Sequence, residues 1–239
     1  MPRGRPALPR NVFSYENTAL ALPSEVVLDT SFVVNALITT EPLHTASRAF
    51  MLALVGNDTT IYYNRLLELE LAEIAFKVAV REQHGAGSWP RLRTDGRVRK
   101  RAGRLTKALI GSWDALLATV PHLRVELEEV GDLVVDTMTT TGLASYDAAH
   151  AATAAFVEAD GLVTNDAGFG HVDEAALTLY VDASRVRSCR RRRGGARFVA
   201  GRAPVPLDAK ARDSSHTPIG HRESEMTRCL LWSLSCIHG

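Results

Sequence analysis

The sequence predicts an α/β domain with a mainly parallel central sheet, and two observations predict it. Short apolar runs of strand length alternate with longer segments that suit helices, and such alternating strands usually pair in parallel beneath helices on both faces. The composition, 46% hydrophobic and 23% charged over 239 residues, is that of a globular protein with enough chain for one good core.

Short apolar runs mark the expected strands. Residues 26–28 form a buried run that ends at Asp29, and residues 59–63 are rich in the β-branched and aromatic side chains that favour strands. Two further strands are expected nearer the end of the domain. A third is expected in the middle of the domain, directly before a helix. The expected strands are residues 26–28, 59–63, 126–130, 162–164 and 177–181.

The segments between these runs have helical character. Residues 66–81 contain neither glycine nor proline and are rich in Leu, Ala and Glu. Ser145 can cap an alanine-rich helix that ends near Gly161. The other expected helices cover residues 44–55, 99–118 and 133–140.

Charge and periodicity divide the chain into three parts. Residues 1–24 carry a net charge of +2, residues 25–182 carry −9 and residues 183–239 carry +8. We expect one folded domain over residues 25–182, an irregular extension over residues 1–24 and a basic tail over residues 183–239 that is disordered or non-native.

Two classes of protein are disfavoured by what the sequence lacks. No apolar run approaches the roughly 18 residues of a membrane span, and the beginning of the chain carries charges and prolines where a secretory signal would be apolar. We therefore expect a cytoplasmic protein without membrane attachment. Cys189, Cys229 and Cys236 match no metal-ligand spacing, which argues against a zinc ribbon or a disulfide framework.

Four acidic residues are placed to meet at one edge of the sheet. Asp29 and Asp166 follow expected strands, Asp147 opens the alanine-rich helix, and Glu70 lies early in the helix after residues 59–63. The carboxyl ends of parallel strands share one crevice, so the four side chains can converge there. Carboxylates packed together without a cation raise one another's pKa, so the cluster favours Mg²⁺ or Mn²⁺.

Three segments around these acids resemble the motifs of the PIN-domain ribonucleases. They read VVLDTS at residues 26–31, SYDAAHAATA at residues 145–154 and VTNDAGF at residues 163–169. The resemblance looks closest to the VapC-like toxins of bacterial toxin–antitoxin pairs and spans roughly residues 25–182. It implies a PIN-like three-layer α/β/α domain and a metal-dependent endoribonuclease that hydrolyses RNA phosphodiesters with water.

The resemblance also implies the site residues. Asp29, Glu70, Asp147 and Asp166 would be catalytic and would hold one or two Mg²⁺ or Mn²⁺ ions. Taken singly, each aspartate also has a purely structural interpretation: Asp29 as the end of a strand, Asp147 at the positive end of its helix dipole and Asp166 in a turn. The occurrence of all of them in the family's order favours the catalytic interpretation.

Glu68 and Glu73 compete with Glu70 for the position of the family's glutamate. The register of the match favours Glu70, because it lies six residues after Asn64, where the family usually has Ser or Thr. Glu73 is spaced for an i,i+4 ion pair with Lys77, which offers it a structural role.

Several polar residues lie beside the four acids in the sequence. His150 follows Asp147 by one helical turn, but a histidine on a helix face is more often packed or capping, so we place it outside the site. Thr30, Ser31 and Asn165 can orient water through their side chains.

The toxin resemblance implies an RNA substrate, a cognate antitoxin protein and a homodimer. Two alternatives remain within the fold: an RNA-processing PIN nuclease without an antitoxin, and a catalytically silent PIN-fold module that binds RNA. A phosphatase like the haloacid dehalogenases is disfavoured because Ser31 stands where a second Asp is needed. A Rossmann dinucleotide binder is disfavoured as well, because it would need a glycine-rich turn after the first strand and the sequence has none there.

Residues 91–107 carry eight basic residues against Asp95, a net charge of +7. One interpretation is a solvated helix face. The other is an RNA-binding strip that includes Arg99, Lys100 and Arg101, with Trp89 and Trp113 stacking on bases.

The C-terminal tail also leaves two interpretations open. Its abrupt loss of periodicity fits a basic RNA-binding tail and an altered reading frame equally well. On either view, deletion of residues 188–239 should leave folding and metal-dependent cleavage intact.

Overall fold

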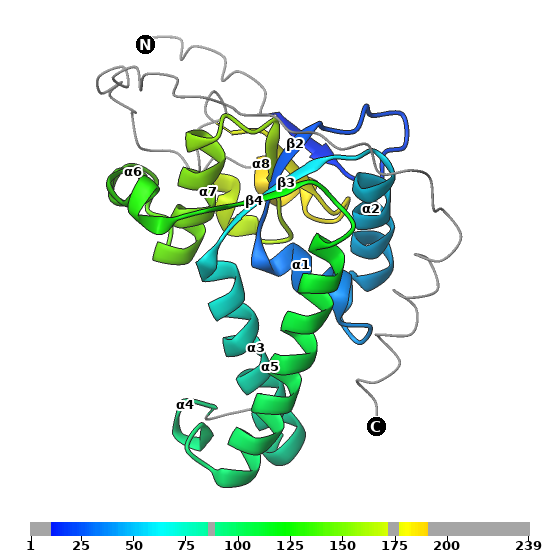
Figure 1. Cartoon of the computed structure of the whole chain (residues 1–239). Helices are drawn as coiled ribbons and strands as arrows, with labels where there is room; N and C mark the ends of the chain where they lie inside the picture. Colours follow the sequence, from blue (N-terminus) through cyan, green and yellow to red (C-terminus); the bar gives the residue numbers. More distant parts are fainter. Residues whose placement is uncertain (1–10, 86–88, 172–176, 191–239) are drawn as a thin grey trace, which may run out of the picture.

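The computed structural model describes residues 11–85, 89–171 and 177–190 of the chain. Within them, six strands form one sheet in the order β1-β6-β5-β2-β3-β4, and each neighbouring pair is parallel. Helices cover both faces of this sheet (Figure 1). The predicted three-layer α/β fold with a parallel sheet is therefore confirmed. The strands are β1 (Val12–Ser14), β2 (Glu25–Leu28), β3 (Thr60–Asn64), β4 (His122–Val125), β5 (Gly161–Val163) and β6 (Leu179–Val181).

The helices are α1 (Thr30–Leu37), α2 (His44–Gly56), α3 (Arg65–His84), α4 (Trp89–Leu92), α5 (Gly96–Leu117), α6 (Leu127–Thr141), α7 (Ser145–Phe156) and α8 (Val186–Arg190), with a 3₁₀ turn η1 (Ala167–His171). Alternate residues of β1, β2, β3, β5 and β6 belong to two buried clusters on opposite faces of the sheet. Val26 and Leu28 point toward α1, α2, α3 and α5, whereas Val27 points toward α7 and α8.

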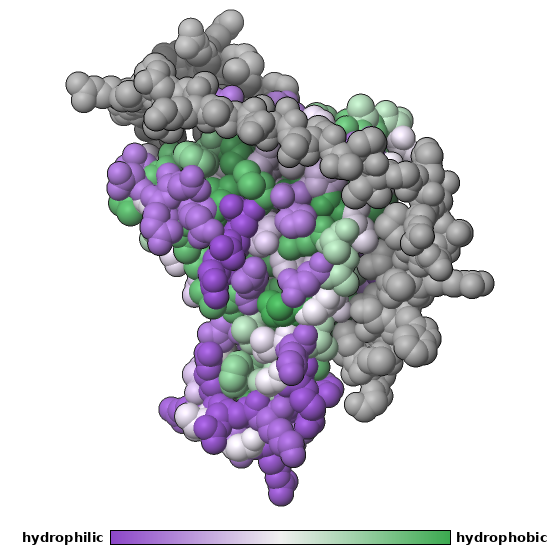
Figure 2. All heavy atoms as spheres, viewed as in Figure 1, coloured by the Kyte–Doolittle hydropathy of each residue, from purple (hydrophilic) through white to green (hydrophobic). Residues whose placement is uncertain are grey.

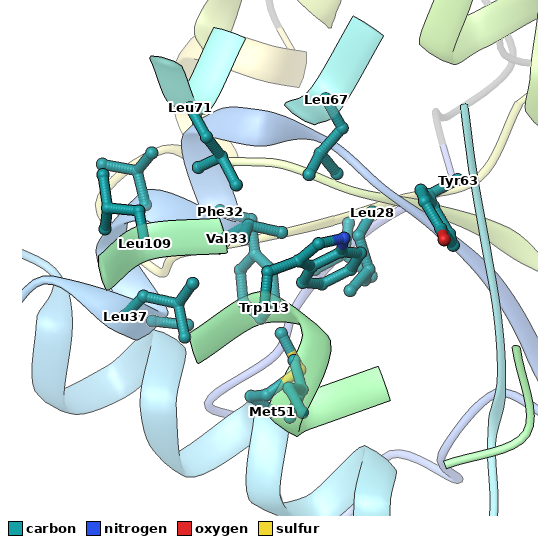
Figure 3. Packing of buried hydrophobic residues seen from close by; sticks show 14 of the residues in the cluster. Leu28, Phe32, Val33, Leu37, Met51, Tyr63, Leu67, Leu71, Leu109 and Trp113 are labelled. Atoms are coloured by element: carbon teal, nitrogen blue, oxygen red, sulfur yellow. The ribbon is translucent and has the colours of Figure 1, made fainter. Parts of the chain in front are cut away.

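Helices α3 and α5 form a long pair that extends from the sheet, with α4 at its far end (Figure 1). Trp113 of α5 anchors the near end of this pair, because its indole is fully buried and meets the ring of Tyr63 edge-on at 5.3 Å between centroids. Leu67 and Leu71 of α3 lie in the same buried cluster (Figure 3). The base of the α3–α5 pair is thus part of the core, which fixes the beginning of α3 against the sheet.

The structure differs from the expected elements in two places: one expected strand is wrong, and one helix was missed. Residues 126–130 do not form a strand: the strand is β4, and α6 begins at Leu127. The reason is a capping box, in which Glu126 and Glu129 satisfy each other's backbone N–H groups at the start of the helix. Helix α1 was not expected at all, although the Asp29 side chain caps it by accepting a hydrogen bond from the Ser31 backbone N–H.

The folded part of the chain is wider than residues 25–182. Residues 12–14, placed by the sequence in an irregular extension, form edge strand β1, which pairs with β6. Residues 186–190, placed in the tail, form α8, and its Cys189 is fully buried against the core. Of the expected extension and tail, residues 1–10 and 191–239 lie outside the described residues.

None of the helices in the described ranges is long and apolar enough to cross a membrane.

Candidate metal centre

Asp29 occupies the junction between β2 and α1. Its backbone N–H donates to the carbonyl of Val163 at 3.0 Å, so the junction is tied to the neighbouring strand β5. Its side chain is buried and accepts hydrogen bonds from the hydroxyls of Ser31 and Thr164, the latter at 2.7 Å. These bonds hold the carboxylate at the carboxyl edge of the sheet.

Glu70 reaches the same place from α3. Asn64 ends β3 and caps α3 by accepting a hydrogen bond from the Leu66 backbone N–H at 3.0 Å, which sets where the helix begins. Glu70 then lies in the second turn, and its Oε2 accepts a hydrogen bond from the Thr30 hydroxyl at 2.6 Å. The link from Thr30 places the Glu70 carboxylate beside Asp29.

His150 of α7 completes the group from the opposite side. Its Nε2 lies 3.0 Å from Oε2 of Glu70 and 3.7 Å from Oδ1 of Asp29, and its ring is fully buried. Its Nδ1 is buried without a hydrogen-bond partner among the described residues. The ring therefore directs its polar contacts to the two carboxylates.

Asp147 lies one turn before His150, in the first turn of α7. Its carboxyl group is half-buried, and this burial, together with the charges of Asp29, Asp166 and Glu70, raises its pKa to about 6. Asp147 therefore carries its charge beside the other three predicted acids.

Asp166 lies on the exposed side of the cluster. Its backbone N–H donates to the Thr164 hydroxyl at 2.9 Å, while its Oδ1 accepts from the backbone N–H of Gly168 at 2.7 Å. Thr164 therefore connects the segment that carries Asp166 with Asp29.

Asn165 is turned the other way. Its side chain accepts a hydrogen bond from the Tyr15 hydroxyl at 2.9 Å and donates to Ser47 at 3.0 Å, and the residue is buried. These hydrogen bonds hold the loop that carries Asp166, so Asn165 has a structural role. That Asn165 also orients water stays a prediction.

Burial and charge act against each other at the centre of the cluster. Burial raises the pKa of Asp29 above its ordinary value, against the opposing influence of His150. Burial alone would lower the pKa of His150, but the hydrogen bond to Glu70 and the charge of Asp29 raise it overall. Positive charge at the cluster is therefore favoured, from the imidazolium or from a cation.

The two competing glutamates have other surroundings. Glu73 forms a bidentate ion pair with Arg93, at 2.6 and 2.8 Å. Glu68 acts on the Tyr63 and Arg124 side chains, whose pKa values it helps to raise. Of the three glutamates, Glu70 is the one that accepts a hydrogen bond from Thr30, the neighbour of Asp29.

The donor set fits a divalent cation. One ligand atom each from Asp29, Glu70 and His150 lies within 4.8 Å of the others, and Asp147 and Asp166 add carboxylate charge beside them. Carboxylate oxygens are the ligands that Mg²⁺ and Mn²⁺ prefer, and the four acids supply them. His150, which the sequence placed outside the site, thus belongs to the candidate metal centre; its only sequence signal was its position one turn after Asp147.

The basic segment, residues 91–107, runs from the end of α4 into the first half of α5. Arg101 forms two hydrogen bonds with Glu82, at 2.7 and 3.1 Å, whereas Arg99 and Lys100 are exposed. Trp113 is fully buried, so the expectation that it offers a stacking surface for bases is wrong. The side chain of Trp89 lies outside the described residues.

The comparisons with known proteins agree with this geometry. The family model of the PIN domain matches residues 26–175, which include all four acids and His150. No curated protein matches the sequence significantly.

Proposed function

Because the chain belongs to the PIN-domain family, we propose that it is a Mg²⁺- or Mn²⁺-dependent endoribonuclease and the VapC-like toxin of a toxin–antitoxin pair. The family gives a nuclease-like fold, and the acidic group can bind metal. The observation that carries the proposal is the meeting of Asp29, Glu70 and His150 within 4.8 Å, with Asp147 and Asp166 beside them.

The residues of the chain have distinct parts in this proposal. Asp29 and Glu70 would hold the ion, because their carboxylates are directed at one point by the hydroxyls of Thr164 and Thr30. A bound divalent ion supplies Lewis acidity: it lowers the pKa of water and offsets the charge that develops on the phosphate. His150 keeps the Glu70 carboxylate turned toward Asp29.

The proposed reaction needs no covalent intermediate. The oxygen of a water molecule bonds to phosphorus while one ester P–O bond breaks, which leaves a phosphomonoester on one fragment and a hydroxyl on the other. The carboxylates of the cluster are the bases available to take the proton of water, and Asp147 and Asp166 lie on its less buried side. The 2′-hydroxyl of RNA takes no part in the bond changes.

The toxin role carries its own expectations. We propose that a cognate antitoxin covers the acidic groove, that the protein acts in the cytoplasm on an RNA needed for translation or growth, and that it forms a homodimer. A reading frame for a small DNA-binding protein beside the gene would support this role over an RNA-processing nuclease without an antitoxin.

The experiment that tests the proposed activity is cleavage of single-stranded RNA with Mg²⁺ or Mn²⁺ and with a chelator. We expect cleavage with metal and none with chelator, and we expect Asp29→Asn to abolish it with circular dichroism unchanged. Asp132→Asn is the matched control, because Asp132 is an exposed acid on α6 outside the group that could hold the metal. Cleavage that survives Asp29→Asn or chelation would overturn the proposal, and so would a 2′,3′-cyclic phosphate end.

A further inference from the structure

Four basic side chains form a stripe along α5. They are spaced by three, four and three residues, which places them on one face of the helix. All four are exposed, whereas Val98, Ala102, Leu105 and Leu109 occupy the buried face of the same helix. We call this the α5 stripe, and it consists of Arg97, Lys100, Arg104 and Lys107.

The α5 stripe is not neutralised by acids within the described part of the chain. The ion pairs of the α3–α5 pair use other cations, Arg93 with Glu73 and Arg101 with Glu82. Asp95, the acid nearest in sequence, caps α5 by accepting from the backbone N–H groups of Arg97 and Val98. The four cations therefore face solvent together.

This arrangement works against the helix that carries it. Like charges three and four residues apart destabilise a helix, and the α5 stripe contains three such pairs in succession. A face that only needs solvation usually mixes the two signs of charge. Figure 2 shows hydrophilic side chains gathered over the end of the α3–α5 pair farthest from the sheet. A polyanion would relieve the repulsion.

The α5 stripe extends away from the acidic cluster along one axis. Helices α3 and α5 run in opposite directions, and the Arg101–Glu82 bond fixes how they are aligned. With a rise of about 1.5 Å per residue, positions can be compared along the common axis of the two helices. Along that axis, Glu70 of α3 lies about 10 Å from Lys107 and about 25 Å from Arg97. A strand that enters the cluster and then runs along the exposed face of α5 would meet the cations in turn.

We propose that the α5 stripe binds the phosphate backbone of single-stranded RNA beyond the point of cleavage. The proposal rests on the proposed nuclease function, because that function makes RNA the ligand. The exposed positive charge of α5 does not depend on it. An acidic cluster repels phosphate at long range, so the protein needs cations elsewhere to attract the chain. Evenly spaced cations suit the repeated charge of a phosphodiester backbone better than they suit one small anionic ligand. Because they contact phosphates and not bases, we expect binding without preference for sequence.

The test measures binding of a labelled single-stranded RNA to the full chain by fluorescence anisotropy, in chelator, over a series of salt concentrations. In chelator the stripe acts without metal and the RNA stays intact. The stripe variant combines Arg97→Ala, Lys100→Ala, Arg104→Ala and Lys107→Ala. The control variant removes the same charge from outside the α3–α5 pair by Arg48→Ala, Arg124→Ala, Arg185→Ala and Arg187→Ala.

We expect the stripe variant to bind RNA at least about tenfold more weakly, with the slope of log K against log salt reduced by about 0.7 for each cation that contacts a phosphate. The control variant should keep most of the slope, and both should keep the circular dichroism of the wild type. Mn²⁺ affinity should not change in either, which separates failure of this proposal from failure of the metal centre.

Equal slopes for the wild type and the stripe variant would overturn the proposal, as would an equal loss in the control variant. A stripe variant that keeps RNA binding but loses binding to a polyglutamate peptide would also overturn it, and would assign the surface to an acidic protein partner.

Discussion

Nε2 of His150 lies 3.0 Å from Oε2 of Glu70, and this contact joins α7 to α3 at the carboxyl edge of the sheet. The same glutamate oxygen accepts the hydroxyl of Thr30 at 2.6 Å. One carboxylate thus ties together α1, α3 and α7, elements far apart in the sequence. The electrostatics of the cluster consequently depend on the state of this contact.

His150→Leu should destabilise the protein more at acid than at alkaline pH. Burial opposes protonation of the imidazole, but the hydrogen bond to Glu70 and the charge of Asp29 raise the pKa of His150 above its ordinary value. A histidine whose folded pKa is raised contributes stability that is complete below its unfolded pKa and is lost as pH rises through its folded pKa. Urea unfolding should show a loss of about 1–3 kcal/mol that is larger at about pH 5 than at about pH 8. An equal loss at both pH values would contradict this electrostatic role.

Asp147→Asn should stabilise the metal-free protein at neutral pH. Burial and the neighbouring carboxylates raise the pKa of Asp147 from 3.8 to about 6, so its ionisation costs stability as pH rises through that window. Since the group is half-buried and solvent screens it, we expect a gain of about 1 kcal/mol, or about 2–4 °C in Tm, above about pH 7.

The gain from Asp147→Asn should disappear below about pH 3, where the aspartic acid is neutral in both the folded and the unfolded state. Thermal unfolding of the two proteins in chelator, with Asp132→Asn as control, measures it. A gain that does not change with pH would show that the carboxylates do not repel one another as described.

Thr164→Val should destabilise the fold by about 1–3 kcal/mol, because it removes a donor from a buried carboxylate. The Thr164 hydroxyl donates to Asp29 at 2.7 Å and accepts from the Asp166 backbone N–H at 2.9 Å. Valine keeps the shape and removes both bonds, whereas Thr164→Ser keeps the hydroxyl. Denaturant midpoints for the two variants should therefore differ, and equal midpoints would assign the cost to packing alone.

Deletion of residues 188–239 should be less well tolerated than deletion of residues 191–239. The longer deletion removes Cys189, whose side chain is fully buried in the cluster that contains Phe169 and Val181. We expect the two truncated proteins to differ by about 1–2 kcal/mol in their free energies of unfolding. If their denaturant curves superimpose, α8 contributes nothing to the domain.

Much of the fold was predictable where local signals and burial agree. The fully buried residues 26–28 and the alanine-rich helix after Ser145 lie where the sequence predicts them. Helix α1 was not predictable in this way, because its Phe32, Val33 and Val34 have strand-like propensity and only the tertiary core makes them helical. The capping box of Glu126 and Glu129 does indicate the start of a helix in the sequence, but residues 126–130 were interpreted as a strand.

The candidate site was predictable to the extent that motifs mark it. Asp29, Asp147 and Asp166 lie in segments that resemble known motifs, and the register of the match selected Glu70. His150 escaped because a single histidine carries no sign of its burial, which only the packing of α7 against the sheet decides. The pairing of Arg101 with Glu82 likewise depends on the alignment of two helices.

The central claim is that the acidic cluster is a divalent metal site, and calorimetric titration with Mn²⁺ tests it most directly. At about pH 7.5, above the raised pKa of Asp147 of about 6, protons compete little with the metal for that carboxylate, and the wild type and Asp132→Asn should bind Mn²⁺ with equal affinity. Asp29→Asn should bind it at least about tenfold more weakly, because one carboxylate ligand is gone. Equal affinity in all three proteins, or no binding to any of them, would contradict the account.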